Sequence, residues 1–367
     1  MPEHIPVIGF TCGDINGIGP EIVIKALANK AFTELCTPVV FASGKLIAYY
    51  RKNLVGYDFS YVPVRQEKIS AGKVNLVNCW EEEVKIEPGK ENETGAAYAL
   101  KSLEIARHYL SENKIHALVT APISKKTMAR MGWGVSGHTE YFGQHFGATP
   151  LMLMVWEKLR VATVTGHVPL SAVAGLLTVE KVVTVIRILD RSLRQDFGVM
   201  RPTIAVLGLN PHASDGGLLG QEEAQILEPA LELLTNEGYL VAGPFSPDGF
   251  WASLRYRDFD AVVAMYHDQG LIPFKLLSGL EGVNYTAGLP VVRTSPDHGP
   301  AFDRAGQSAA NESSLRAATY LAIDILRHRA NYREATANPL PLSRREKDQE
   351  STHEAPNELL NPIQASS

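Results

Sequence analysis

The feature that most constrains the fold is a regular alternation of short, β-branched apolar runs with longer amphipathic stretches. Strand-like runs occupy residues 6–10, 38–42, 116–120, 202–207 and 260–265, and apolar positions at helical spacing occupy residues 20–29, 93–113, 178–196, 222–236 and 313–329. Strands that alternate with helices pair in parallel, because each helix carries the chain back across a face of the sheet. The sequence therefore predicts an α/β protein with a parallel sheet and helices on its faces.

Composition and charge exclude several classes of protein. The 367 residues contain 35 Lys and Arg against 40 Asp and Glu, a net charge of −5 without a basic cluster, which argues against nucleic-acid binding. No apolar run reaches the roughly 18 residues that span a bilayer, and the N-terminus lacks the pattern of a signal peptide. The three cysteines form no Cys-x-x-Cys pair. We expect a cytoplasmic protein without membrane contacts, and a flexible tail at residues 335–367, which are polar and rich in Pro.

Three of the eleven histidines share a setting that the others lack. His167, His212 and His267 each follow an apolar strand-like run, at the sheet edge where ligands bind in open α/β proteins. Three imidazoles that converge there would hold a divalent cation and leave coordination positions open, as catalytic metal sites do. Imidazole ligands suit zinc, cobalt, nickel or iron, whereas a ligand such as Asp268 would bring manganese or magnesium into contention. The alternative is that each histidine separately caps its strand.

Polar residues in two further segments are candidates for substrate binding. His138 and Thr139 lie in the cluster SGHTE, where an imidazole and a hydroxyl can both reach an oxyanion. Lys275, Asn284 and Arg293 lie in a segment that is otherwise apolar or rich in Gly. Such cations favour a pocket for phosphate and carboxylate, because Arg offers a planar fork and Lys a point charge. Taken alone, loop hydrogen bonds and surface cations explain these residues equally well.

Two loops that contain glycine complete the candidate sites. The loop GDINGIGPE at residues 13–21 follows the first strand and opens the first helix, either as a packing turn or as a ligand loop. It matches neither the dinucleotide fingerprint nor the Walker loop. The loop DHGPAFDRAG at residues 297–306 precedes the last helix and can present backbone groups to a nucleotide. His298, Gly299 and Asp303 in this loop are therefore candidates for cofactor binding.

Seven ordered motifs together resemble the 4-hydroxythreonine-4-phosphate dehydrogenase family, which acts on the route to pyridoxal phosphate. They are GIGPE (17–21), TAPISK (120–125), GHTE (137–140), TGH (165–167), NPH (210–212), YHDQG (266–270) and RTSPDHG (293–299), and the resemblance extends over about residues 6–329. It departs from the family at DIN (14–16), where a version with Pro is common. The resemblance implies a divalent cation on His167, His212 and His267, and a substrate held by His138, Thr139, Lys275, Asn284 and Arg293.

The resemblance also implies a fold and an assembly. The family's fold is similar to that of isocitrate and isopropylmalate dehydrogenases, with two α/β/α domains flanking a cleft. Residues 1–125 and 290–334 would form the first domain, and residues 126–289 the second, with the metal site and the dimer contacts. Enzymes of the family are homodimers whose metal site takes ligands from both subunits, so we expect the monomer to be inactive.

The reaction that the resemblance implies is the oxidation of a secondary alcohol of 4-phosphooxy-L-threonine by NAD or NADP, followed by decarboxylation to 3-amino-2-oxopropyl phosphate. A Lewis-acidic cation would assist both steps, and Asp268 and Lys275 are the candidate catalytic groups. Related dehydrogenases of erythronate or threonate 4-phosphate, or of cyclic dihydrodiol carboxylates, share the metal histidines. A transferase similar to phosphate acyltransferases and a non-catalytic binding protein are the alternatives from other classes.

Overall fold

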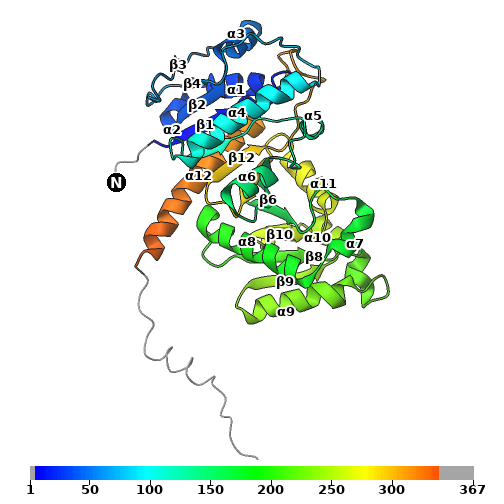
Figure 1. Cartoon of the computed structure of the whole chain (residues 1–367). Helices are drawn as coiled ribbons and strands as arrows, with labels where there is room; N and C mark the ends of the chain where they lie inside the picture. Colours follow the sequence, from blue (N-terminus) through cyan, green and yellow to red (C-terminus); the bar gives the residue numbers. More distant parts are fainter. Residues whose placement is uncertain (1–4, 339–367) are drawn as a thin grey trace, which may run out of the picture.

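Twelve strands form one continuous mixed sheet in the computed structural model, which describes residues 5–338 (Figure 1). The half that contains the N-terminus is parallel throughout. In spatial order its strands are β3 (Val62–Pro63), β4 (Asn75–Asn78), β2 (Thr37–Ala42), β1 (Val7–Thr11), β5 (Ala117–Val119) and β12 (Val292–Pro296). Because β12 pairs with β5, the chain returns to this half after it has built the other half.

The second half of the sheet departs from the parallel arrangement that the sequence predicts. Its strands, in spatial order, are β11 (Val283–Ala287), β6 (Leu151–Trp156), β7 (Leu159–Thr163), β10 (Ala261–Ala264), β8 (Thr203–Leu207) and β9 (Leu240–Phe245). β11 is antiparallel to β12 and to β6, and β6 is antiparallel to β7. The physical reason is connection length, since only two residues join β6 to β7 and so short a link permits only a hairpin.

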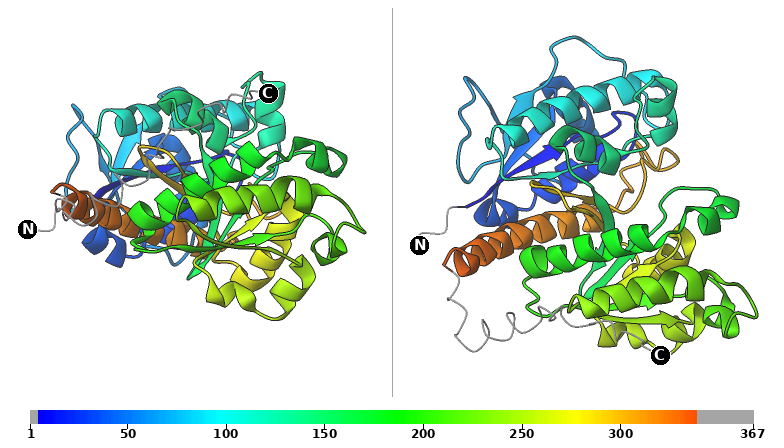
Figure 2. Two further views of the ribbon diagram at one scale, coloured as in Figure 1. Left: turned by 90° about the horizontal axis from the view of Figure 1, so that it is seen from below. Right: turned by 60° about the horizontal axis from the view of Figure 1, so that its bottom comes forward.

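Helices cover both faces of the sheet, which confirms the α/β class (Figures 1 and 2). They are α1 (Gly19–Leu27), α2 (Ala31–Leu35), α3 (Gly44–Asn53), α4 (Glu93–Ser111), α5 (Lys125–Arg130), α6 (His138–Phe146), α7 (Val173–Leu176), α8 (Val179–Phe197), α9 (Glu228–Asn236), α10 (Pro247–Ala252), α11 (His267–Ser278) and α12 (Ser313–Thr336). One-turn helices span Leu170–Ala172, Pro211–Asp215, Glu223–Leu227 and Arg255–Asp258.

Each buried strand contributes side chains to two hydrophobic cores, because successive side chains of a strand point to opposite faces of the sheet. In β10, Ala261 and Val263 belong to the core that α8 covers, whereas Val262 and Ala264 belong to the core that contains Phe274 of α11. Both faces of the central strands are therefore closed to water. The polar side chains that continue from these strands emerge only at the strand ends, where a site can form.

A buried polar cluster joins α8, β11 and α12, of which the two helices run side by side (Figure 2). Arg329 of α12 donates from Nε to Oδ1 of Asp196 over 2.7 Å, and the Tyr285 hydroxyl donates to Oδ2 of the same carboxylate over 2.7 Å. Arg329 also donates to the carbonyl oxygens of Leu289 and Pro290. The cluster ties the last helix to the junction between the two halves of the sheet.

The end of the described chain differs from the predicted tail. α12 extends to Thr336, so the first two residues of the predicted tail still belong to the helix. The rest of that prediction concerns residues 339–367, which lie outside the described part of the chain. Within residues 5–338, no helix combines the length and the apolar character that crossing a bilayer requires.

Candidate functional site

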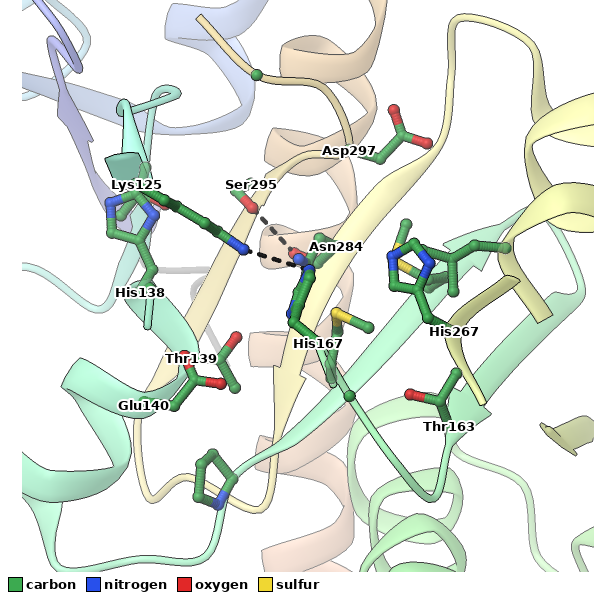
Figure 3. Close-up of a pocket in the computed structure, with 18 of the residues that line it drawn as sticks. Lys125, His138, Thr139, Glu140, Thr163, His167, His267, Asn284, Ser295 and Asp297 are labelled. Carbon is green, nitrogen blue, oxygen red and sulfur yellow. Dashed lines mark hydrogen bonds between the residues drawn. The ribbon is translucent and has the colours of Figure 1, made fainter. Parts of the chain in front are cut away.

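A cavity of about 900 Å³ is lined by residues from both halves of the sheet (Figure 3). Its walls come from the loop after β5, the start of α6, strands β6, β11 and β12, helix α11, and the loop after β12. The two halves meet where the sheet turns antiparallel, and there the polar loops of both halves converge. The cavity is large enough for a small substrate together with part of a cofactor.

All five predicted substrate residues line this cavity, although they come from four separate elements. His138 and Thr139 are the first two residues of α6, Lys275 lies on α11, Asn284 on β11 and Arg293 on β12. The fold thus brings together residues that lie up to 155 positions apart in the sequence (293 − 138 = 155). Their role in holding a substrate stays a prediction, but all five line the same cavity.

Arg293 is a buried cation without a carboxylate partner. Its side chain is among the largest fully buried ones, and Nε and Nη2 donate to the hydroxyl of Thr120 over 3.0 and 2.6 Å, while Nη1 donates to the hydroxyl of Thr286 over 3.1 Å. No carboxylate of residues 5–338 lies within 4 Å of the guanidinium. Burial lowers the pKa of Arg293 to about 9, and the Glu140 carboxylate partly opposes that shift. A buried, uncompensated guanidinium favours an anionic ligand.

Several buried polar atoms of the cavity wall lack a hydrogen-bond partner in the described part of the chain. They are Nε2 of His138, Oδ1 of Asn284, Oδ2 of Asp297 and Nε2 of His298. Burial lowers the pKa of His138 well below its usual range, and the charges of Arg293 and Lys125 add to the shift, so the imidazole is neutral. Buried polar groups are almost always satisfied in proteins, and these atoms therefore indicate a polar ligand.

The three predicted metal histidines follow neighbouring parallel strands. His167 follows β7, His267 follows β10 and His212 follows β8, and β10 pairs with both β7 and β8. The rings of His167 and His267 lie with centroids 5.2 Å apart and line the cavity together (Figure 3). Nδ1 of His267 lies 2.6 Å from Oδ1 of Asp268, a contact that orients the ring and leaves Nε2 for a ligand.

His212 does not join this pair within the chain. It lies in the one-turn helix Pro211–Asp215 with a left-handed backbone (φ 53°) and is not part of the cavity wall. In the described ranges, no three His, Cys, Asp or Glu side chains of one chain come together closely enough to hold a metal ion. A single chain therefore brings together two of the three predicted histidines, and the three-histidine centre stays a prediction.

The two candidate catalytic groups lie in different places. Lys275 lines the main cavity, where its Nζ donates to the carbonyl oxygen of Asp297 over 3.1 Å. Asp268 is exposed and lines a smaller cavity of about 450 Å³ that adjoins the main one through His167 and His267. The structure thus puts Lys275 near the predicted substrate residues and Asp268 beside the histidine pair.

The predicted cofactor loop reaches the cavity with part of its length. His298 and Gly299 line the cavity, whereas Asp303 is exposed and lies outside its wall. The loop at residues 13–21 lies behind it, and the Ile18 amide donates to the carbonyl oxygen of Pro300 over 2.9 Å. The first loop therefore acts as a packing turn that supports the second loop, and none of its residues lines the cavity.

A buried ion pair strengthens this support. Lys25 lies 2.8 Å from Glu21 and donates to the carbonyl oxygens of Ser308 and Ala310. The Glu21 carboxylate also accepts from the Ala310 amide over 3.0 Å. Both charges in this clamp of Glu21 and Lys25 have partners of opposite charge or polarity. The clamp fixes the segment directly after the predicted cofactor loop to α1.

The sequence analysis missed Lys125 as a candidate site residue. Lys125 is the first residue of α5 and lines the cavity, and its Nζ lies 3.4 Å from Nε2 of His167 (Figure 3). Burial lowers the pKa of Lys125, and the nearby Glu140 carboxylate opposes that effect. The available signal was the motif TAPISK, which directly follows strand β5 and ends at Lys125.

Comparison with known proteins supports one family. The family model described as "Pyridoxal phosphate biosynthetic protein PdxA" matches residues 34–322. The 4-hydroxythreonine-4-phosphate dehydrogenase of Bacteroides thetaiotaomicron is 46% identical over 343 residues, which cover 93% of this chain and 94% of that protein. A protein of Oceanobacillus iheyensis named putative D-threonate 4-phosphate dehydrogenase is 36% identical over 326 residues, 87% of this chain and 98% of that protein.

A solved structure agrees with these sequence relatives. The crystal structure of 4-hydroxythreonine-4-phosphate dehydrogenase from Klebsiella pneumoniae superposes with a TM-score of 0.75 at 35% identity. The match covers 89% of this chain and 99% of that one, so the likeness extends over both halves of the sheet. The chain therefore belongs to the family of the pyridoxal phosphate biosynthetic protein PdxA.

Proposed function

We propose that the protein is an oxidoreductase of pyridoxal phosphate biosynthesis that oxidises 4-phosphooxy-L-threonine with NAD or NADP and releases carbon dioxide and 3-amino-2-oxopropyl phosphate. The observation that carries the proposal is the buried Arg293 without a carboxylate partner, in a cavity that also contains the His167–His267 pair. Its relatives named as dehydrogenases of a phosphorylated hydroxy acid support the same chemistry.

The substrate-binding step uses residues from both halves of the sheet. Arg293 provides the buried positive charge, and the neutral His138 with Thr139 provides hydrogen-bonding groups at the start of the nine-residue helix α6. A helix N-terminus adds a favourable field for phosphate or carboxylate. Lys275 and the free Oδ1 of Asn284 complete the polar wall. Binding at several points fixes the alcohol carbon, which hydride transfer to a nicotinamide requires.

The cofactor would lie against the loop after β12. His298 and Gly299 line the cavity there, and the free Nε2 of His298 offers a hydrogen bond to a polar ligand. The clamp of Glu21 and Lys25 holds the segment directly after this loop in place. An ordered loop is needed, because hydride transfer requires the donor and acceptor atoms to be held within a narrow range of distances.

A divalent cation would be held by His167 and His267 of one chain and by His212 of a second copy. When it is bound, such a cation supplies Lewis-acid chemistry at the oxidised oxygen of the substrate. Asp268 would keep the His267 ring oriented through the 2.6 Å contact to Nδ1. The two imidazoles alone leave the donor set incomplete, which is the reason for proposing a homodimer with shared sites.

Exposed leucines beside the histidine loops support this dimer. Leu170 is 72% exposed shortly after His167, and Leu218 is 78% exposed shortly after His212. On α11, which begins at His267, Leu276 is 81% exposed. Large apolar side chains with this degree of exposure favour burial against a partner. A second copy would cover them and could bring His212 towards the cavity.

A second candidate substrate is threonate or erythronate 4-phosphate. The similarity to the protein named putative D-threonate 4-phosphate dehydrogenase favours it. These acids also carry a phosphate, a carboxylate and a secondary alcohol, so the cavity groups named above can bind them in the same way. A cavity built around phosphate and carboxylate charge does not by itself distinguish an amino group from a hydroxyl.

The direct test is a spectrophotometric assay of reduced nicotinamide. The purified protein with added zinc or manganese should reduce NAD or NADP with 4-phosphooxy-L-threonine, and less efficiently with erythronate or threonate 4-phosphate. A higher kcat/KM with one of the sugar acids would show that this acid is the preferred substrate, and the proposed reaction type would be unchanged. The absence of reduction with every one of these acids and both nucleotides would refute the dehydrogenase proposal.

The shared site has a sharper test in mixed dimers. His167→Ala and His212→Ala should each lose bound metal and turnover, because each variant damages every site. Co-expressed, they should regain about a quarter of the parent activity, since half of the dimers would contain one intact site. The matched control mixes His167→Ala with His267→Ala, which belong to the same half site and should not recover. Equal recovery, or none, in both mixtures would contradict a site built from two chains.

A further inference from the structure

Lys125 reaches into the cavity from the side opposite His267 (Figure 3). It begins α5, whose N-terminus is capped by Ser124, so its backbone is fixed at the cavity rim. A Cβ at Gly137 would lie 3.1 Å from Cε and 3.5 Å from Nζ of Lys125. The missing side chain at Gly137 therefore leaves the space that the ammonium group occupies, beside the start of α6.

The charge of Lys125 has no carboxylate partner, which distinguishes it from its neighbours. Lys126, the next residue, pairs with Glu91 over 3.4 Å, and Lys275 pairs with Asp297 over 3.8 Å. Among residues 5–338, no carboxylate lies within 4 Å of Nζ of Lys125, and its contact is with Nε2 of His167 over 3.4 Å. An ammonium group in a cavity without such a partner is available to an anionic ligand.

Two such cations face the same space. Lys125 and Arg293 both line the main cavity. Like charges that line one cavity repel each other, while the Glu140 carboxylate opposes the lowering of the pKa of both cations. An anion between them would relieve the repulsion and would gain a charge-assisted hydrogen bond from each.

We propose that Lys125 is a further substrate-binding residue, whose ammonium group contacts an anionic oxygen of the phosphorylated hydroxy acid between the start of α6 and His167. This inference rests on the proposed function for the identity of the acid, but not for the presence of an anion site. The anionic oxygen belongs to the phosphate or to the carboxylate, which have the same recognition chemistry. Nζ lies beside Gly137 at the start of α6 and 3.4 Å from Nε2 of His167, so an anion bound there would contact both elements.

The test compares Lys125→Met and Lys125→Arg with Arg130→Met. Arg130 lies on the same helix, is exposed and does not line the cavity, so its replacement removes one positive charge from α5 without touching the site. Lys125→Met should lower kcat/KM about ten- to a hundredfold, chiefly through KM, and Lys125→Arg should restore part of the loss. Arg130→Met should match the parent. Thermal unfolding of all three should also match, because no buried contact is removed.

Calorimetric titration with inorganic phosphate separates the two sources of the anion. A tenfold weaker affinity of Lys125→Met assigns the contact to the phosphate, and an unchanged phosphate affinity with a raised KM assigns it to the carboxylate. If neither the phosphate affinity nor the KM changes, Lys125 does not bind the substrate. Bound metal is measured in the same samples, and a loss of affinity that disappears when metal is restored would also overturn the proposal.

The same experiment distinguishes this inference from the proposed function. A protein that reduces no nicotinamide, yet binds phosphate through Lys125, would retain the anion site and lose the dehydrogenase proposal. A protein that turns over the acid with the same KM after Lys125→Met would retain the dehydrogenase proposal and lose this inference.

Discussion

Two buried arginines in two regions of the molecule differ in the partners of their guanidinium groups. Arg329, at the junction of α8, β11 and α12, donates to the Asp196 carboxylate, to the Tyr285 hydroxyl and to two carbonyl oxygens. Burial by itself would lower the pKa of Arg329, but Tyr285 and Asp196 raise it. Arg293, in the cavity, donates only to hydroxyl groups, and burial lowers its pKa to about 9. The first charge thus has a carboxylate partner, whereas the second has only neutral hydroxyl partners in residues 5–338.

Two lysines show the same difference in whether a carboxylate pairs with the charged group. Lys25 is almost fully buried, and a carboxylate and two carbonyl oxygens surround its ammonium group. Lys125 has no carboxylate within reach in the described chain. Lys25 and Arg329 hold elements together, whereas Lys125 and Arg293 line the cavity. A carboxylate within 4 Å, rather than residue type, distinguishes the first two cations from the second two in residues 5–338.

Arg329→Met should have the largest effect on stability. It leaves the fully buried Asp196 without its cation, and breaking a buried pair in this way lowers the free energy of unfolding by about 3–5 kcal/mol. Urea denaturation measures the loss. Arg327→Met, which removes an exposed arginine from the same helix, is the control and should change the free energy by less than about 0.5 kcal/mol. A loss as small as that of the control would show that Arg329 is not structural.

Arg293→Met should give the reverse pattern. Its partners are neutral hydroxyls, so no buried charge is stranded, and the free energy of unfolding should stay within about 1 kcal/mol of the parent. The KM of the phosphorylated acid should rise by the equivalent of about 2–3 kcal/mol, because a charged hydrogen bond is lost. Denaturation and steady-state kinetics on the same samples measure both effects. If Arg293→Met were as destabilised as Arg329→Met, the proposed difference between the two arginines would be wrong.

Asp14→Asn should show the smallest effect, and one that depends on pH. Asp14 is buried, its Oδ2 has no partner in residues 5–338, and burial with some help from Glu91 raises its pKa to about 6. Because the folded-state pKa is raised, the carboxyl destabilises the protein increasingly as pH rises from about 4 to 6 and fully above that range. Asp14→Asn should therefore stabilise the fold by about 1–2 kcal/mol at pH 7.5 and much less near pH 4.5. A gain that is equal at both pH values would contradict this assignment.

Much of the fold could be predicted from the sequence, and the errors have physical causes. The alternating runs located β1, β2, β8 and β10, since a strand with two buried faces needs a continuous apolar run. β12 was not predicted, because its five buried residues include Arg293 and Thr294, whose polar side chains interrupt the apolar run. A central strand tolerates these residues only because the cavity and the last helix supply partners, as when Thr294 donates to the carbonyl oxygen of Ala318.

The candidate site shows the same limits. Position after a strand was sufficient to select His167, His212 and His267, because parallel neighbours expose their carboxyl ends on one edge. It did not reveal that His212 stands apart from the other two within one chain. It also did not separate Gly299, which lines the cavity, from Asp303, which does not, because a loop's path depends on what supports it.

The sequence by itself determined the α/β class and the sheet edge at which the histidines emerge, since both follow from local periodicity and from the pairing of strands. The tertiary structure alone decided which charges find partners. Glu21 and Lys25 are four residues apart on one helix, and their pairing is local. That no carboxylate of residues 5–338 lies within 4 Å of the charged groups of Lys125 and Arg293 depends on elements brought together from distant parts of the chain. Electrostatic energy depends on distance in space and on burial, and neither quantity is written in the order of the residues.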